Sequence, residues 1–371
     1  MTMEKILILG GYGLTGKPLA RHLLQQTGCQ LVLAGRNLAK AGAEADALNA
    51  VFPGGRVSAA RVDAANPQEL RAALQGVDFL LNVAPTTSVT ETVVRAALDA
   101  GVDYLDVQLS ANKLEILKSH ADEVERRGLC FITEAGFHPG LPSALVRYAA
   151  QKLDRLERAD IACYLNMGVG LPYSEAVDEL MEAFQDYQAQ VFKNGAWTRP
   201  GSYEMRKVQF GGEIGQRLCY SMFFEELRAL PEMIPSLQNA GFYISSTHWF
   251  VDGVLTPLVM LGLKLAPRRG IRPMGRLLWW GMQNLPKPPH LVLLRLEAEG
   301  RKDGIPARVE LSVSHPDGYE LTAVPVAACL LQVLDGSARR PGLWMMGHLV
   351  DPARLLMDMQ GMGIEVHDGN A

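Results

Sequence analysis

Residues 5–16 read KILILGGYGLTG, and this stretch decides the fold of the first part of the chain. Lys5–Leu9 is almost continuously apolar, which is typical of a parallel strand that is buried on both faces. Gly11, Gly13 and Gly16 follow with the spacing GxGxxG, and a helical pattern of leucines begins directly after them. A strand, this glycine spacing and a helix, in that order, predict a βαβ unit that binds a dinucleotide.

The six residues from the first to the last of these glycines form the predicted phosphate-binding loop. In such a loop the first glycine makes the tight turn, the second lets the backbone approach the pyrophosphate, and the third allows close packing of helix on strand. The free N–H groups at the start of the following helix then bind the phosphates. We expect cofactor contacts from all six residues, which are Gly11, Tyr12, Gly13, Leu14, Thr15 and Gly16.

The end of the second strand indicates which nicotinamide cofactor is bound. A domain that binds NAD has an acidic residue there, whose carboxylate bonds the ribose 2′-hydroxyl. Here the strand ends in Ala34, Gly35, Arg36 and Asn37. Arg36 lies 20 residues after Gly16, and its guanidinium can bind a 2′-phosphate through two hydrogen bonds. We therefore predict NADP(H), with Arg36 and Asn37 in its site; the alternative is that Arg36 is a solvated surface arginine.

The ends of the third and fourth strands supply the remaining predicted cofactor contacts. Asp63 follows the third strand, where it either contacts the cofactor or caps the next turn. The fourth strand ends in Asn82, Val83, Ala84 and Pro85. Because ligands of open α/β sheets lie beyond the carboxyl ends of the strands, this loop should border the ribose and the nicotinamide.

The pattern along the rest of the chain predicts two domains. Strands and helices alternate through about residue 135, which predicts an α/β Rossmann domain with a doubly wound parallel sheet. Beyond it, 174–194 is predicted as one amphipathic helix, and two runs of period two flank Asp303 and Gly304 as in a β-hairpin. The second domain is therefore predicted to be α+β with a mixed or antiparallel sheet. We also expect a strand at 319–324 and helices at 325–334 and 351–362.

The composition excludes several classes of protein. The 371 residues are 48% hydrophobic and 20% charged, a balance that rules out a disordered chain. The net charge of −4 argues against a dedicated nucleic-acid-binding protein. The five cysteines are far apart in the sequence, so neither a metal site nor a disulfide framework is predicted, and we expect free thiols in a reducing cytoplasm.

Five segments, taken in order, carry a resemblance to a known family. They are residues 6–16, residues 34–36, residues 82–85, the sequence AGVDYLD at 100–106 and the sequence GFHPGL at 136–141. Together they resemble the NADP-binding domain of the saccharopine dehydrogenase (saccharopine reductase-like) family. The resemblance is clear over about residues 4–145 and weaker near 322–336 and 342–366.

The resemblance implies an NADP(H)-dependent oxidoreductase that reduces a C=N bond, or a C=C bond, of a small metabolite. It also implies that residues 1–137 form the Rossmann domain and that 325–371 packs back on it. Residues 138–324 would form an α+β domain for substrate and dimer contacts, so we expect a homodimer. The middle of the chain, 150–320, departs most from the family and leaves the substrate open.

Proton transfer would fall to residues at the ends of the fifth and sixth strands. Tyr104 and Asp106 share one face of the fifth strand by alternation, together with Gln108. Tyr104 and Asp106 are predicted catalytic residues because a phenol or a carboxyl can donate a proton; the alternative is a buried aromatic and a local cap. His138 is a third candidate because an imidazole titrates near neutral pH. The family often has Asp at that position, and a structural loop histidine is the alternative.

A basic amphipathic stretch at 254–285 leaves a second class of function open. Leucines and the adjacent Trp279 and Trp280 are interleaved there with Lys264 and several arginines. Such a stretch lies on a membrane surface, forms an apolar lid, or packs as core helices with solvated arginines. The alternative to an enzyme is therefore a non-catalytic nucleotide-binding sensor or scaffold with a peripheral membrane contact.

Overall fold

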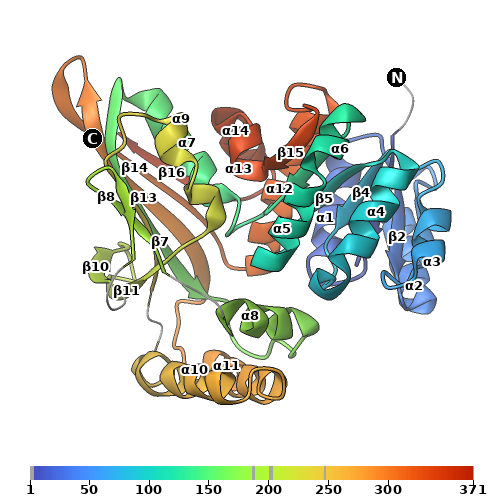
Figure 1. The fold of residues 1–371 in the computed structure, drawn as a ribbon, viewed down its shortest axis with the longest axis horizontal. Helices are drawn as coiled ribbons and strands as arrows, with labels where there is room; N and C mark the ends of the chain where they lie inside the picture. The colour runs from blue at the N-terminus through green and yellow to red at the C-terminus, as the bar shows by residue number, and fades with distance from the viewer. Residues whose placement is uncertain (1–3, 186–188, 200–203, 246–247, 371) are drawn as a thin grey trace. The chain divides into compact units, whose positions relative to one another are not determined.

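The chain forms two compact units (Figure 1). Unit 1 comprises Met1–Leu141 and Thr322–Met362, and unit 2 comprises Pro142–Leu321 and Gly363–Ala371. The backbone therefore passes from one unit to the other at three points along the sequence. The computed structural model describes residues 4–185, 189–199, 204–245 and 248–370.

Unit 1 alternates strands and helices along most of its length. Its first part contains β1 (Lys5–Leu9), α1 (Gly16–Gln26), β2 (Gln30–Gly35), α2 (Leu38–Val51), β3 (Val57–Arg61), α3 (Pro67–Ala73), β4 (Phe79–Asn82), η1 (Thr87–Val89), α4 (Thr90–Ala100), β5 (Asp103–Asp106), α5 (Ala111–Ser119), α6 (Ala121–Arg126) and β6 (Cys130–Thr133). Its C-terminal part contains most of α12 (Gly318–Leu334), then β15 (Gly342–Met345), α13 (Met346–Leu349) and α14 (Pro352–Gly361).

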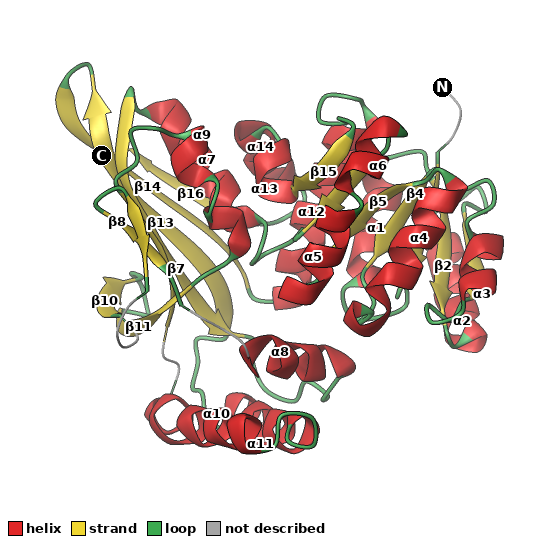
Figure 2. Ribbon diagram, viewed as in Figure 1, coloured by secondary structure: helices red, strands yellow, loops and turns green. Residues whose placement is uncertain are grey.

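The sheet of unit 1 is parallel throughout its described residues. Its seven strands lie in the order β15-β6-β5-β4-β1-β2-β3. Strands β1 to β6 thus have the order 3-2-1-4-5-6, which defines a Rossmann sheet. Helices cover both faces of the sheet (Figure 2), which explains why its central strands are apolar on both sides. The predicted α/β Rossmann fold is confirmed.

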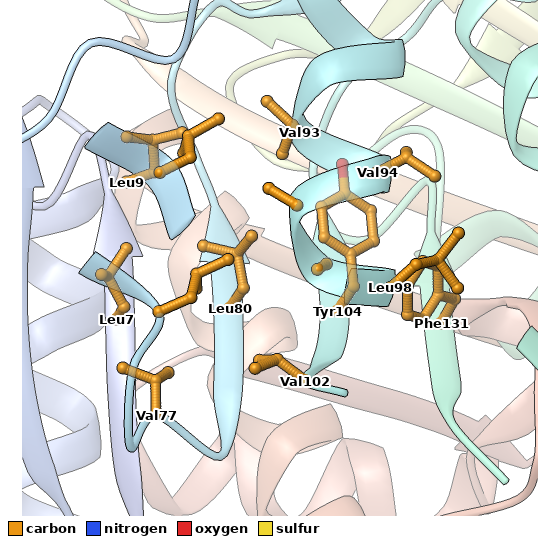
Figure 3. Packing of buried hydrophobic residues seen from close by; sticks show 14 of the residues in the cluster. Leu7, Leu9, Val77, Leu80, Val93, Val94, Leu98, Val102, Tyr104 and Phe131 are labelled. Carbon is orange, nitrogen blue, oxygen red and sulfur yellow. The ribbon is translucent and has the colours of Figure 1, made fainter. Parts of the chain in front are cut away.

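One layer of the core of unit 1 joins the sheet to α4. Leu80 of β4, Tyr104 of β5 and Phe131 of β6 belong to one cluster with Val93 and Leu98 of α4 (Figure 3). All five side chains are fully buried. Burial of each such side chain stabilises the fold by about 1.5–3 kcal/mol. This packing therefore fixes the positions of β4 and β5, and with them the strand ends that bear the predicted site.

The C-terminal part of unit 1 packs on the edge of this sheet. Strand β15 pairs in parallel with β6. Arg339 donates two hydrogen bonds to the carboxylate of Asp103, with N···O distances of 2.7 and 3.1 Å. The prediction that all of 325–371 packs on the first domain is wrong for the last residues, because residues 363–371 belong to unit 2.

Unit 2 combines long strands with several helices. Its elements through β12 are α7 (Leu141–Lys152), β7 (Arg155–Asn166), α8 (Glu175–Gln185), β8 (Val191–Lys193), β9 (Ala196–Thr198), β10 (Met205–Gln209), β11 (Gln216–Met222), η2 (Glu225–Leu227), α9 (Leu230–Met233) and β12 (Asn239–Ser245). The remainder are η3, a π-helix (Val251–Leu255), α10 (Thr256–Leu265), α11 (Ile271–Asn284), β13 (Leu291–Lys302), β14 (Ile305–His315) and β16 (Glu365–Asn370).

The sheet of unit 2 is mixed, as predicted. Its main path among the described residues is β10-β11-β12-β7-β13-β14-β16, in which only β12 and β7 pair in parallel. The predicted hairpin at Asp303 and Gly304 is confirmed, with Lys302 paired to Ile305. Both turn residues have positive φ, 53° and 76°, which is the conformation of a type I′ turn and favours Asp-Gly.

Two predicted elements differ in the structure. The helix predicted over 174–194 is α8, which ends at Gln185; residues 186–188 lie outside the described residues, and Val191 begins β8. The strand predicted at 319–324 is wrong, because these residues belong to α12, and Pro325 lies inside that helix rather than at its start. A short and largely buried run that contains β-branched and aromatic residues fits both a strand and a helix, so the sequence pattern alone could not separate them.

The helices of unit 2 include a layer made by α8, η3, α10 and α11 (Figure 1). Its core contains Met181, Val251, Leu255, Val259, Leu263 and Leu278. Across the described residues, we find no helix that combines the length and the apolar character needed to cross a membrane. The five cysteines are buried free thiols.

Truncation of the core layer on α4 should destabilise unit 1. Leu80→Ala removes a fully buried side chain, and we expect a loss of about 2–5 kcal/mol in the free energy of unfolding. Leu38→Ala is the matched control, since Leu38 is 49% exposed and its loss should change stability by less than about 0.5 kcal/mol. Urea denaturation of both variants measures the difference, and equal midpoints would contradict the assigned packing.

Candidate functional site: the carboxyl edge of the parallel sheet

The glycine loop between β1 and α1 is held by its own backbone. Gly10 has φ of +86°, and its N–H donates to the Ala34 carbonyl at the end of β2 (2.8 Å). The Gly13 N–H donates to the Gly10 carbonyl (2.8 Å). A Cβ at Gly16 would overlap that same carbonyl oxygen and the backbone of Gly11. Gly16 is therefore required for the close packing that its place in the motif predicts.

The N-terminus of α1 offers backbone donors to an anion. Thr15 is the N-cap residue and makes no side-chain cap hydrogen bond, and the first turn contains no acidic residue. The first N–H groups of a helix have no partner within the helix and carry the positive end of its dipole. Leu14 beside them is 43% exposed, which places this turn at the surface of unit 1. The arrangement suits a phosphate group.

Tyr12 connects the glycine loop to the end of β2. Its ring lies against Gly35, where an added Cβ would come within 2.6 Å of the tyrosine oxygen. That oxygen accepts a hydrogen bond from the Asn37 N–H (3.0 Å). The Asn37 side chain caps α2 by accepting from the Lys40 N–H (3.0 Å). Arg36 lies between Gly35 and Asn37 and is exposed, so the contacts of its two neighbours fix its backbone at the surface.

The loop after β4 borders the glycine loop. The Val83 N–H donates to the Leu9 carbonyl (3.0 Å), and an added Cβ at Gly10 would lie 3.0 to 3.1 Å from atoms of Ala84. Pro85 is exposed, whereas Asn82 is buried. The structure thus brings Asn82, Val83, Ala84 and Pro85 to the edge of the sheet that carries the glycine loop.

Asp63 has a local partner. Its side chain accepts a hydrogen bond from the Ala65 N–H (3.0 Å), and its own N–H donates to the Glu69 carboxylate (2.9 Å). This geometry favours the alternative that Asp63 caps the turn after β3. A cofactor contact by Asp63 stays a prediction.

A buried polar network joins the ends of β4 and β5. The Asn82 amide donates to the Thr86 hydroxyl (2.8 Å) and to the Tyr104 hydroxyl (3.3 Å). The Gln108 amide donates to the Ala84 carbonyl (2.6 Å) and to the Thr86 hydroxyl (2.8 Å). The side-chain oxygens of Asn82 and Gln108 are buried and have no hydrogen-bond partner among the described residues. The sheet edge therefore contains two buried acceptor oxygens that are unpaired among the described residues.

Lys113 is a buried cation that the sequence did not single out. It lies in the first turn of α5 and is fully buried, as is Asp106, to whose Oδ1 its Nζ donates (2.7 Å). The same Nζ donates to the Gln108 carbonyl (2.6 Å) and to the Thr133 hydroxyl (2.7 Å). The Asp106 carboxylate also accepts from the Gln108 N–H and the Thr133 hydroxyl. The ion pair thus fixes the backbone of Gln108 at the end of β5.

The geometry bears on the three predicted proton donors. Tyr104 is fully buried in the core, and burial, together with the charge of Asp106, raises the pKa of its hydroxyl well above the ordinary value. Asp106 is engaged by Lys113 and Thr133. Burial lowers the pKa of His138 to about 4, so its imidazole is neutral at pH 7. Catalytic roles for Tyr104, Asp106 and His138 stay predictions, and their surroundings favour positioning and packing roles.

The loop that contains His138 has an unusual backbone. Glu134 has φ of +52°, which is uncommon for a residue with a side chain, and Gly136 and Gly140 have φ of +127° and +122°. An added Cβ at Gly140 would lie 2.7 Å from the Gly136 backbone. His138 packs on Phe137 with ring centroids 4.2 Å apart. Such concentrated positive φ values occur at functional loops, where the surrounding structure enforces them.

The residues present fit a dinucleotide with a 2′-phosphate. The glycine loop and the N-terminus of α1 would hold the pyrophosphate, and Arg36 would hold the 2′-phosphate. The buried acceptors of Asn82 and Gln108 match the hydroxyl and amide donors that such a cofactor carries. When bound, this cofactor supplies or accepts a hydride. The described residues contain no group of His, Cys, Asp and Glu side chains arranged to hold a metal ion.

The strand order, the glycine loop and Arg36 together define a nucleotide-binding domain of the pyridine-nucleotide oxidoreductase class. Residues 6–128 match the family described as the saccharopine dehydrogenase NADP binding domain. The match confirms the resemblance of this first domain to the saccharopine dehydrogenase NADP-binding domain, and the cofactor is NADP(H).

Two curated relatives extend the similarity beyond the first domain. The chain is 24% identical over 262 residues to carboxyaminopropylagmatine dehydrogenase of Synechocystis, covering 67% of this chain and 64% of that protein. It thus spans slightly less than two thirds of that relative. It is 25% identical over 333 residues to carboxynorspermidine synthase of Vibrio cholerae, covering 78% of this chain and 77% of that protein.

A solved structure supports the fold of both units. The apo saccharopine dehydrogenase (L-Glu forming) of Saccharomyces cerevisiae aligns with a TM-score of 0.71 at 14% identity, covering 99% of this chain and 100% of that chain. At that identity the likeness concerns the fold alone.

The buried ion pair should be essential to the stability of this edge. Lys113→Met leaves the Asp106 charge buried without its cation, and we expect a loss of about 3–5 kcal/mol in the free energy of unfolding. Adding Asp106→Asn removes that charge while keeping an acceptor for Thr133, so the double variant should recover part of the loss. Urea denaturation measures both. The control is Lys118→Met on the exposed side of α5; if Lys113→Met behaves like it, or if Asp106→Asn brings no recovery, the charge argument fails.

His138 should make stability depend on pH. Because its folded pKa of about 4 lies below the unfolded value of about 6.5, the unfolded chain binds more protons at this residue between those pH values. Stability should therefore fall as the pH drops from 6.5 toward 4. His138→Gln should lose less stability than the wild type between pH 7 and pH 5 in urea titrations. The exposed His367→Gln serves as the control, and identical pH dependence in His138→Gln and the wild type would refute the assignment.

Proposed function

We propose that this protein is an NADPH-dependent reductase of a C=N bond that joins an amine to the carbon skeleton of a small metabolite. The observation that carries the proposal is the similarity to the Synechocystis dehydrogenase and the Vibrio synthase, which extends past the nucleotide-binding domain into unit 2. The names of both relatives denote carboxylated polyamines. We extend that class of substrate, an amine that bears a carboxylate, to this chain.

The chemistry of C=N reduction suits the residues at the sheet edge. A protonated imine that gains a hydride at carbon becomes a neutral amine, because the electron pair of the C=N bond moves to nitrogen. No general acid is needed in that step. The buried Tyr104 and the paired Asp106 are then free to act as positioning residues that fix Asn82 and Gln108.

Reduction of a C=C bond makes a different demand. There a proton must be delivered to carbon after the hydride, which requires an acidic group within reach. The surroundings of Tyr104, Asp106 and His138 oppose that role. The raised pKa of Tyr104 makes its hydroxyl a weaker proton donor, Asp106 is paired with Lys113, and His138 is neutral at pH 7 because its pKa is lowered to about 4. We therefore favour C=N over C=C reduction. A homodimer through unit 2 remains part of the proposal.

The cofactor assignment has a direct test. Calorimetric titration should give tighter binding of NADPH than of NADH, and Arg36→Ala should weaken NADPH binding roughly ten- to a hundredfold while sparing NADH, because the bidentate contact to the 2′-phosphate is lost. Arg126→Ala is the matched control: it removes the same charge from an exposed residue just before β6, at the opposite edge of the sheet. An equal loss in both variants would mean that Arg36 acts only through net charge.

The substrate class is tested in the direction of oxidation. Carboxynorspermidine, carboxyaminopropylagmatine and saccharopine are each offered with NADP⁺, and NADPH formation is followed by absorbance. Turnover of one of the first two supports the proposal. Turnover of saccharopine alone would mean that saccharopine, and not a carboxylated polyamine, represents the substrate class. Stoichiometric NADPH binding without any turnover would favour a nucleotide-binding sensor or scaffold.

A further inference from the structure

Helix α10 of unit 2 and the π-helix η3 that leads into it are apolar on two sides. One side is formed by Val259 and Leu263, which continue the line of Val251 and Leu255 in η3 at four-residue spacing and are buried. The other side is exposed to solvent. Its members and their exposed fractions are Val254 41%, Leu258 49%, Leu261 52% and Leu265 76%. Successive members lie four, three and four residues apart, so they form one stripe along the helix.

The buried side already completes the packing of the helical layer. Gly262 of α10 lies so close to α11 that an added Cβ would overlap Met274, and Gly281 of α11 approaches Leu255 in the same way. Met181 of α8 and Leu278 of α11 fill the rest of this core. The exposed stripe is therefore not part of the core of unit 2, and its four side chains need another explanation than internal packing.

The charge along the segment that carries the stripe is of one sign. Between Asp252 and Glu297 the sequence contains seven Lys or Arg residues and no carboxylate. Three of the seven, Lys264, Arg268 and Arg269, lie at the C-terminal end of α10 or in the loop after it; all are exposed, and none forms an ion pair with a described residue. Cations at the last turn of a helix also interact favourably with its dipole. The stripe thus ends in a basic cluster.

We propose that this surface, defined as the stripe with Lys264, Arg268 and Arg269, binds the surface of an anionic lipid membrane. Apolar side chains on one helix face with cations beside them are what a helix needs to lie in the interfacial region, where the apolar face enters the acyl boundary and the cations contact lipid phosphates. The occupant must supply negative charge, which the patch itself lacks. A second copy of the same patch would bring like charges together, so self-association is disfavoured.

The contact would be parallel to the membrane plane. With ten residues at 1.5 Å per residue, α10 is about 15 Å long, about half the thickness of a bilayer core. Trp249, which is 71% exposed just before η3, is a residue type enriched at the membrane interface. The surface therefore has the parts of a peripheral contact, and it stands independently of the reaction that the protein catalyses.

Vesicle sedimentation with the full chain tests the proposal. Wild-type protein is mixed with vesicles of phosphatidylcholine alone or with 30% phosphatidylserine, at low and high salt. We expect binding to the anionic vesicles that weakens with salt and little binding to the neutral ones. Arg268→Gln with Arg269→Gln should reduce binding about tenfold or more, and Leu258→Ser with Leu261→Ser should reduce it at both salt concentrations.

The control double variant Arg126→Gln with Lys302→Gln removes the same charge from exposed sites elsewhere and should bind within about twofold of the wild type. Unchanged NADPH affinity in every variant verifies that unit 1 remains folded. The proposal is overturned if the wild type binds neither vesicle, if it binds both equally, or if the control loses as much as the Arg268 and Arg269 variant. Concentration-dependent self-association that Leu258→Ser with Leu261→Ser abolishes, without vesicle binding, would assign the surface to a second copy instead.

Discussion

The site of unit 1 depends on the absence of side chains where three backbone segments meet. Gly16 allows α1 to begin against the Gly10 carbonyl, Gly10 allows the loop after β4 to approach, and Gly35 leaves room for the ring of Tyr12. A methyl group at any of these positions would separate the loops that form the predicted phosphate site. Since the Asn37 N–H donates to the Tyr12 hydroxyl, a continuous series of contacts connects the glycine loop to the residue next to Arg36.

Much of the fold of unit 1 could be predicted because its sequence signals are local. Buried parallel strands give continuous apolar runs, and the glycine spacing with its flanking strand and helix defines one βαβ unit. Unit 2 was less predictable. Its hairpin has an explicit Asp-Gly signal, but α12 contains β-branched residues and an internal proline. Its helical state therefore depends on tertiary packing, which buries most of its residues, rather than on local preference.

The site was predictable as far as strand ends and motifs define it. Arg36, the glycines and the loop at 82–85 could be placed because a parallel sheet collects the carboxyl ends of its strands at one edge. Lys113 could not, because a lysine in the first turn of an amphipathic helix is usually solvated, and only the tertiary contact with Asp106 and Thr133 distinguishes it. Alternation correctly placed Gln108 with Asp106, but it could not indicate which of their atoms would be left without partners.

The division of the chain has a consequence for its synthesis. Unit 1 is completed only by the segment 322–362, which follows nearly all of unit 2, and the sheet of unit 2 gains its edge strand β16 only from residues 365–370. The ribosome synthesises the chain from its N-terminus, so both sheets are incomplete until late in synthesis. The sheet of unit 1 then has an unpaired edge at β6, and the sheet of unit 2 has one at β14. Both edges gain their last strands only from residues after 321, so the two units complete their folding at the same late stage of synthesis.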